Sequence, residues 1–281
     1  MNRTLPLALL ILIPVHGCGG GTTGACMAPC SASVSDAGSQ EAGQGDASAS
    51  PPGTPVLSGA ETEQRLGSMH ILDIRPKAAF DAGHLPAARW VDPGAFRSTR
   101  GGVSGQVLEP TKAKLALSPL GLSEGEPIIV YGDATSTEPA RMVWTLQYYG
   151  FDDVALLDGG FDRWIEEQRT VETEPASVTP NEPNLEPNET IRVEWEWVRD
   201  HLEDPGMILV DARSEGEYSA GHIPGARNIN WQTMVSGGSF LPRSDIADLY
   251  AGIAKDKTVI AYCQTGSRGS ATWVALRWLG Y

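Results

Sequence analysis

Short apolar runs alternate with stretches of helical periodicity in the C-terminal part of the chain. Residues 207–210 and 258–262 are apolar runs of strand length, each bounded by polar residues. Residues 194–202, 243–252 and 270–279 place their apolar side chains at helical spacing. Strands that alternate with helices pair in parallel and are covered on both faces. The pattern therefore predicts an α/β fold around a mainly parallel sheet, with any ligand at the carboxyl ends of the strands.

The pattern occurs twice along the chain. Residues 73–89 and 211–227 align without a gap and are identical at eight of 17 positions, which are Asp73/Asp211, Arg75/Arg213, Ala82/Ala220, Gly83/Gly221, His84/His222, Pro86/Pro224, Ala88/Ala226 and Arg89/Arg227. Residues 126–150 and 256–280 align next, with one extra residue in the first copy. The chain is thus predicted to contain two copies of one module.

The two modules are predicted to span residues 56–169 and 191–281. The segment 170–190 between them is rich in Pro and Glu, which is typical of a linker. Residues 19–55 are rich in Gly, Ala and Ser and have almost no large apolar side chains, so they predict a flexible tether. The second copy lacks the strand, turn and helix that end the first copy. We therefore expect an incomplete second module, in a fragment or a shortened gene model.

Residues 1–18 have the features of an export signal. Arg3 gives a positive start, and the apolar run after it is too short to span a hydrocarbon core of roughly 30 Å as a helix. The sequence Val-His-Gly-Cys that ends at Cys18 resembles the bacterial lipobox, whose cysteine takes the lipid. We expect export, lipidation of Cys18 and anchoring to a bacterial membrane at the cell envelope or periplasm; an ordinary secretory signal is the alternative. Cys26 and Cys30 are expected to form a local disulfide, with metal capture or redox relay as the alternative.

Charge and cysteine placement narrow the candidate chemistry. The formal net charge of −14 at pH 7 argues against a nucleic-acid partner, because phosphate binding requires a basic face. Three of the four cysteines lie near the N-terminus, and Cys263 stands alone near the other end. This is not the pattern of a disulfide framework or of a metal site with paired ligands. Cys263 is therefore the residue to explain.

Cys263 directly follows the predicted strand 258–262 and precedes a predicted helix. Free backbone N–H groups at such a position, together with the helix dipole, stabilise a thiolate. Arg268 adds a fixed positive charge suited to an oxyanion, and Gly266 permits a tight turn. The candidate substrate-binding loop consists of Gln264, Thr265, Gly266, Ser267 and Arg268. The alternative is an inert buried cysteine at a strand end.

Three segments of the second copy resemble the second domain of the rhodanese family. They are DAR…EY…GHIPGA from residue 211, the stretch GGSFLPRSDIADLYAGI and the loop YCQTGSRGS. The resemblance covers residues 56–281 and implies two three-layer α/β/α domains. It further implies a thiosulfate sulfurtransferase in which Cys263 takes a sulfane sulfur as a persulfide, sulfite leaves, and cyanide or a thiol accepts the sulfur. Donor and acceptor are then small molecules, the kinetics are ping-pong, and no metal or organic cofactor is needed.

The first copy has no thiol at the matching position, where it reads Tyr131-Gly132-Asp133. The resemblance implies that residues 56–169 form a catalytically silent domain, a structural or substrate-channel partner of the second. Asp133 acting as a catalytic acid is the alternative.

The repeated motif residues are interpreted as structural support. Asp211 and Arg213 are expected to fix the loops by ion pairs and hydrogen bonds. His222 recurs as His84 in the copy without a thiol, which favours a structural role over that of a catalytic base. Trp231 is a candidate pocket-lining residue. Core or interdomain packing is expected for four further tryptophans, Trp195, Trp197, Trp273 and Trp278.

Three other functions compete with thiosulfate sulfurtransfer. Phosphatases on the same fold have one more residue between the cysteine and the arginine than separates Cys263 from Arg268, which disfavours phosphate-ester cleavage. Enzymes that use 3-mercaptopyruvate usually have a Cys-Gly-Ser-Gly-Val loop without the arginine, so the present loop favours thiosulfate. A non-catalytic rhodanese-like binding module at the cell envelope is the alternative from a different class, and the incomplete second copy gives it weight.

Overall fold

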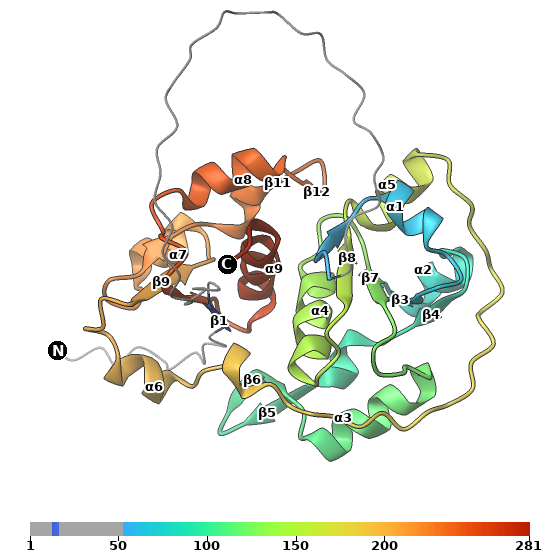
Figure 1. Cartoon of the computed structure of the whole chain (residues 1–281), viewed down its shortest axis with the longest axis horizontal. Coiled ribbons are helices and arrows are strands. Elements are labelled where there is room, and N and C mark those ends of the chain that lie inside the picture. The colour runs from blue at the N-terminus through green and yellow to red at the C-terminus, as the bar shows by residue number, and fades with distance from the viewer. Residues whose placement is uncertain (1–12, 17–52) are drawn as a thin grey trace, which may run out of the picture.

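A computed structural model describes residues 13–16 and 53–281 of the 281-residue chain. It consists of two α/β units that lie side by side (Figure 1). The predicted lipidation site Cys18, the pair Cys26 and Cys30, and most of the predicted signal peptide and tether lie outside the described residues.

The first unit is built on a five-stranded parallel sheet in the order β2-β8-β7-β3-β4. Its strands are β2 (Val56–Leu57), β3 (His70–Asp73), β4 (Ala88–Trp90), β7 (Ile128–Tyr131) and β8 (Val154–Leu157). Its helices are α1 (Gly59–Gln64), α2 (Lys77–Ala82), η1 (Pro93–Phe96), α3 (Pro110–Leu117), η2 (Ser118–Leu120), α4 (Glu138–Tyr148) and α5 (Gly160–Glu166). Every residue of β7 and β8 is buried, because helices cover both faces of the sheet.

The second unit repeats this plan on a smaller sheet in the order β1-β13-β9-β10. Its strands are β9 (Met207–Asp211), β10 (Arg227–Asn228), β13 (Thr258–Tyr262) and β1 (Ile13–His16). Its helices are η3 (Glu189–Ile191), α6 (Trp195–Asp200), α7 (Glu215–Ala220), η4 (Trp231–Met234), α8 (Arg243–Tyr250) and α9 (Ser267–Leu279). The expected α/β fold with a mainly parallel sheet is confirmed for both units.

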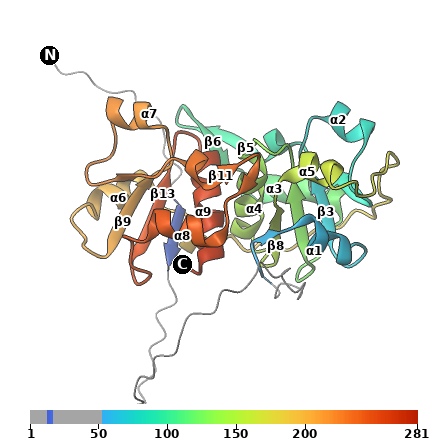
Figure 2. The same cartoon turned by 90° about the horizontal axis from the view of Figure 1, so that it is seen from above.

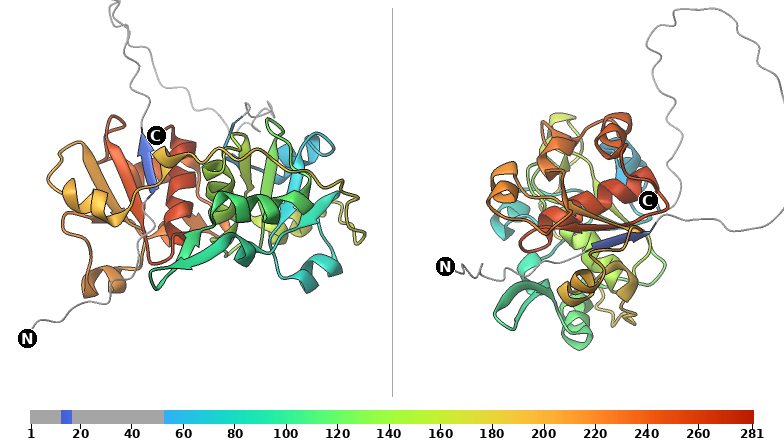
Figure 3. Two further views of the ribbon diagram at one scale, coloured as in Figure 1. Left: turned by 90° about the horizontal axis from the view of Figure 1, so that it is seen from below. Right: turned by 90° about the vertical axis from the view of Figure 1, so that its left-hand side faces the viewer.

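The two sheets differ at one edge. In the first unit β8 pairs in parallel with β7, on the side away from β3. In the second unit the same side of β13 pairs with β1 in antiparallel orientation, with Ile13 opposite Ala261. Figure 3 shows β1 in blue alongside this sheet. The sheet edge that β8 occupies in the first unit is thus occupied in the second unit by a segment that belongs to the predicted signal peptide.

Helices α4 and α9 bring the two units together. They pack against each other between the two sheets (Figure 2), and their buried side chains belong to one hydrophobic cluster that extends into both units. Nearly the whole length of each helix is buried, and α9 has no amphipathic pattern. No helix among residues 53–281 combines the length and the apolar character that a bilayer crossing requires.

Each unit also extends a two-stranded antiparallel hairpin towards the other. The first hairpin is formed by β5 (Arg97–Arg100) and β6 (Val103–Val107), and the second by β11 (Val235–Ser236) and β12 (Ser239–Phe240). A Cβ atom added to Gly105 in the first hairpin would lie 2.7 Å from the carbonyl oxygen of Thr265, so this hairpin touches the segment after β13. A Cβ atom added to Gly238 in the second hairpin would lie 2.3 Å from the Cβ of Ala134, in the segment after β7.

Candidate active site

The loop at the carboxyl end of β13, residues 263–268, is called the Cys263 loop. Cys263 is 1% exposed, and its Sγ accepts a hydrogen bond of 3.1 Å from the backbone N–H of Gly266. Gly266 has φ of +93°, a left-handed conformation that favours glycine, and it is the N-cap of the 13-residue helix α9. The sulfur therefore lies at a helix N-terminus, where backbone N–H groups and the helix dipole favour negative charge.

Arg268 is paired with a carboxylate that the sequence reading missed. Its Nη1 and Nη2 donate to the two carboxylate oxygens of Glu217 at 2.7 and 3.1 Å. This bidentate pair raises the pKa of Arg268, and the same hydrogen bonds lower the pKa of Glu217 to about 2. Glu217 also closes a capping box with Ser214 at the start of α7. That Ser-x-x-Glu pattern could be read from the sequence as a helix start, but not as a partner for an arginine 51 residues away.

Asp211 and Arg213 form an ion pair at the carboxyl end of β9. The buried Asp211 carboxylate accepts hydrogen bonds from Arg213 Nε at 2.9 Å and from Nη2 at 2.6 Å, and Arg213 Nη2 also donates to the carbonyl of Gly221. The first unit repeats the network with Asp73 and Arg75. Because a loop without a thiol has the same network, the network supports the fold of both units.

The two motif histidines also occupy equivalent positions. His222 Nδ1 lies 2.8 Å from the carbonyl oxygen of Tyr218, and its ring stacks on that tyrosine. His84 makes the same pair of contacts with Phe80. Both histidines close the turn after a short helix, in agreement with the structural role predicted for them.

The first unit contributes charged side chains to the Cys263 loop. Ser267 Oγ donates to Glu138 Oε1 at 3.0 Å and accepts from Arg97 Nη2 at 2.9 Å, and Arg97 and Glu138 also form an ion pair. Arg141 of α4 donates through Nη1 to the carbonyl of Thr265 at 3.2 Å. None of these first-unit residues was found from the sequence. The available signal was a charged residue, Arg141, inside an otherwise apolar helical stretch.

A hollow of about 220 Å³ lies beside the Cys263 loop. Its lining consists of Arg97, Ser98, Thr99, Ser104 and Gly105 from the first hairpin and Thr265 from the Cys263 loop. Hydroxyl groups and one guanidinium therefore face it, which suits a small polar or anionic molecule.

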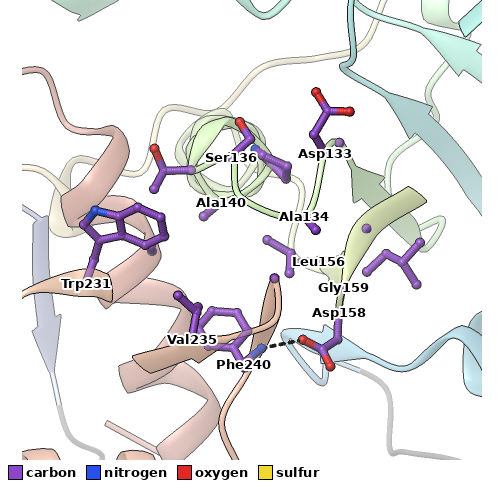
Figure 4. Close-up of a pocket in the computed structure, with 17 residues that line it drawn as sticks. Asp133, Ala134, Ser136, Ala140, Leu156, Asp158, Gly159, Trp231, Val235 and Phe240 are labelled. Atoms are coloured by element: carbon purple, nitrogen blue, oxygen red, sulfur yellow. Dashed lines mark hydrogen bonds between the residues drawn. The ribbon is translucent and has the colours of Figure 1, made fainter. Parts of the chain in front are cut away.

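A second cavity, of about 40 Å³, lies at the loop after β7, residues 132–137, which is called the Gly132 loop (Figure 4). Trp231 lines this cavity together with Phe240 and Ala271, so the predicted pocket-lining tryptophan lies beside the Gly132 loop and does not line the hollow at the Cys263 loop. The carboxylate of Asp133 points away from Trp231 in Figure 4. Burial raises the pKa of Asp133.

The tryptophan expectations are partly wrong. Trp273 is buried in the core of α9, and Trp278 packs against the same cluster. Trp195 and Trp197, however, are 37% and 36% exposed, because α6 lies on the outside of the second unit and buries mainly Val198. Among residues 53–281, no group of three His, Cys, Asp or Glu side chains is placed to hold a metal ion.

The comparison with protein families decides the identity of the fold. The model described as "Rhodanese-like domain" matches residues 58–167 and again 194–281. The chain belongs to the rhodanese family. The rhodanese-like domain is thus present twice, and the Cys263 loop belongs to the second copy.

Relatives of this rhodanese are named as thiosulfate sulfurtransferases or as a sulfur carrier protein. The chain is 34% identical over 229 residues to "Putative thiosulfate sulfurtransferase" of Haloferax volcanii, covering 72% of this chain and 77% of that protein. It is 33% identical to "Sulfur carrier protein TtuD" of Thermus thermophilus, covering 72% and 79%, and 29% identical to "Thiosulfate sulfurtransferase" of Corynebacterium glutamicum, covering 80% and 81%. These matches support the sulfurtransferase class.

Solved structures with the same fold include SseA from Escherichia coli, described as a 3-mercaptopyruvate sulfotransferase. Its TM-score is 0.71 at 23% identity, and the match covers 80% of this chain and 94% of that one. An anaerobic ergothioneine biosynthesis enzyme from Chlorobium limicola also has a TM-score of 0.71, at 20% identity, with 81% and 65% covered. At these identities the likeness establishes the rhodanese fold alone.

Proposed function

We propose that this rhodanese is a thiosulfate sulfurtransferase that carries a sulfane sulfur on Cys263. The observation that supports this most directly is the position of Sγ, which accepts the Gly266 N–H at the N-terminus of α9 with Arg268 in the first helical turn. In the first half-reaction the Cys263 thiolate attacks the outer sulfur of thiosulfate. A bond forms between the two sulfurs, the S–S bond of thiosulfate breaks, and sulfite leaves with the electron pair.

The second half-reaction returns the enzyme to its starting state. Cyanide or a thiolate attacks the outer sulfur of the persulfide, and the Cys263 thiolate is the leaving group. The backbone N–H of Gly266 donates to Sγ, and we expect the other loop residues, Gln264, Thr265, Ser267 and Arg268, to contribute further contacts to the substrate sulfur. The persulfide is then the only carrier that the cycle needs, and the first domain is catalytically silent.

Intact-mass measurement of the purified chain tests this proposal. Incubation with thiosulfate is expected to add the mass of one sulfur atom, cyanide is expected to remove it, and Cys263→Ser is expected to show no gain. A gain in mass with 3-mercaptopyruvate but not with thiosulfate would make 3-mercaptopyruvate the sulfur donor in place of thiosulfate. No gain with either donor, in a sample shown by circular dichroism to be folded, would favour the non-catalytic binding module.

We also propose that the protein is exported and anchored to a bacterial membrane through lipid on Cys18. The motif that ends at Cys18 supports this, and processing before that cysteine would remove β1 (Ile13–His16), which lies in the sheet of the unprocessed chain. In cells that process such signals, Cys18→Ala is expected to move the protein from the detergent-extracted membrane fraction to the soluble fraction. A wild-type protein that is already soluble would leave the ordinary secretory signal as the better account.

A further inference from the structure

Five charged side chains surround the Cys263 loop, and four of them form ion pairs. Arg268 pairs with Glu217, and Arg97 pairs with Glu138. The fifth, Arg141, is 3% exposed and forms no ion pair with any carboxylate among residues 53–281. With three arginines and two glutamates, the surroundings of the loop carry one unbalanced positive charge.

The contacts of Arg141 do not remove that charge. Its Nη1 and Nη2 donate to the carbonyls of Thr265 and Gly105, at 3.2 and 2.8 Å, and its guanidinium lies 4.8 Å from the ring centre of Trp144. Its Nε has no hydrogen-bond partner among the described residues. A buried cation in such surroundings is costly unless an anion lies near it.

Burial lowers the pKa of Arg141 to about 9, and repulsion from Arg97 acts in the same direction. Attraction to Cys263, Glu138 and Tyr149 opposes this lowering, and the sulfur is the largest of the three. Glu138 is already engaged by Arg97 and Ser267. The sulfur of Cys263, which also attracts Arg268, is therefore the remaining group that can balance Arg141 as an anion.

A single peptide unit connects the two groups. The carbonyl of Thr265 accepts from Arg141, and the N–H of the same peptide, which belongs to Gly266, donates to Cys263 Sγ at 3.1 Å. A cation on the carbonyl side polarises the peptide and strengthens the hydrogen bond on its N–H side. Arg141 thus holds the orientation of the donor as well as contributing charge.

The pseudosymmetric position in the other unit supports this assignment. Arg141 lies nine residues before Gly150 at the end of α4, and its counterpart nine residues before Gly280 at the end of α9 is Ala271. Ala271 lines the cavity beside the Gly132 loop, which has no thiol. The cation is present only on the helix that faces the sulfur.

We propose that Arg141, from the first domain, is a positioning residue that stabilises the anionic sulfur of Cys263 across the domain interface through the Thr265–Gly266 peptide. The part that concerns the persulfide rests on the proposed function, whereas the part that concerns the thiolate does not. The sulfur carries one negative charge as thiolate and as persulfide, so one resident cation matches both states. The first domain is then silent in having no nucleophile but takes part in the chemistry of the second.

The pH profile of Cys263 alkylation tests the proposal. The full chain is treated with iodoacetamide, a neutral reagent, at a series of pH values, and the Cys263 peptide is quantified by mass spectrometry. Arg141→Gln removes the charge but keeps an amide that can donate to Thr265, and we expect the profile to move by about one pH unit or more to higher pH. Arg141→Lys keeps the charge and should move it less. Arg277→Gln, which removes an exposed arginine from α9, should leave it in place.

A folded Arg141→Gln with the wild-type profile overturns the proposal. If Arg141→Gln does not fold, Glu138→Gln provides the test. Removing this nearby negative charge should move the alkylation profile of Cys263 to lower pH. An alkylation profile that stays in place or moves to higher pH overturns the proposed charge balance. Alkylation needs no sulfur donor. A wild-type protein that fails to load sulfur from thiosulfate would therefore sink the proposed function without affecting this result.

Discussion

The strands β7 and β13 end in the same way in the two domains, and the domains differ at the residue that follows. β7 ends at Tyr131 and β13 ends at Tyr262, and each tyrosine is paired with the aspartate of the neighbouring strand, Asp73 or Asp211. Each tyrosine hydroxyl accepts a backbone N–H, from Leu85 or Ile223, at 3.1 Å. The next residue is Gly132 in one domain and Cys263 in the other. The framework that positions a strand-end loop is therefore common to both domains, and a single side chain separates a loop with a nucleophile from one without.

The hairpins that cover the two loops differ in chemistry as well. The first hairpin presents Arg97, Ser98 and Ser104 at the Cys263 loop, around a hollow. The second hairpin presents Val235 and Phe240 at the Gly132 loop, and the backbone N–H of Phe240 donates to Asp158 at 2.8 Å. The first hairpin therefore meets its loop with polar side chains, and the second meets its loop with apolar ones.

Exchanging Cys263 and Gly132, the residues that distinguish the two loops, should have the largest effect on sulfur loading. Cys263→Gly is expected to abolish sulfur loading in the mass assay, because no nucleophile remains. Gly132→Cys should not restore it, because the new Cβ would lie 2.9 Å from Pro139 Cγ and 3.2 Å from Ile74 Cγ1. That crowding should destabilise the protein by about 1–3 kcal/mol in urea unfolding. A Gly132→Cys protein that gains cyanide-removable sulfur in the Cys263→Gly background would show that a thiol is all the first loop lacks.

Substituting one glycine in each hairpin distinguishes an effect of the hairpin on catalysis from an effect on stability. Gly105 and Gly238 have φ of +82° and +81°, and an added Cβ would lie 2.7 Å from the Thr265 oxygen and 2.3 Å from the Ala134 Cβ respectively. Both substitutions to Ala should lower the thermal unfolding midpoint, because each strains the backbone by about 1–2 kcal/mol. Only Gly105→Ala should slow persulfide formation, by roughly tenfold or more, because only it displaces the Cys263 loop. Equal rates for the two variants would contradict the assignment of the first hairpin to the active site.

The Arg268–Glu217 pair predicts a smaller, pH-dependent effect. The folded-state pKa of Glu217 is lowered to about 2 from an ordinary value of 4.5, so the pair stabilises the fold above about pH 4.5 and loses this contribution as the pH falls towards 2. The Glu217 side chain is 38% exposed, so screening limits the contribution to about 1 kcal/mol or less. The urea midpoints of wild type and Glu217→Gln should differ at pH 7 and converge between pH 4.5 and 2. A difference that persists unchanged at pH 2 would be inconsistent with titration of Glu217.

Much of the framework could be predicted because it is encoded locally. The strand predicted at residues 258–262 is β13, and the helix predicted from residue 270 begins at Ser267. The early start reflects the first helical turn, which is made by polar and small residues without apolar periodicity. Trp195 and Trp197 were misjudged for the opposite reason, because aromatic character alone does not show which face of a short helix meets the core.

Local sequence patterns encode the repeat, the α/β class, the family resemblance and the position of Cys263 at a strand end. Periodicity, identity at fixed spacing and glycine at the turn act over a few residues, so the linear pattern contains them. The charged side chains that meet the Cys263 loop are brought there by long-range packing. Arg268 meets Glu217 and Thr265 meets Arg141 across 51 and 124 residues of chain. Such pairings depend on the packing of α7 against the loop and of α4 against α9, and charge balance in a buried site is a property of that packing.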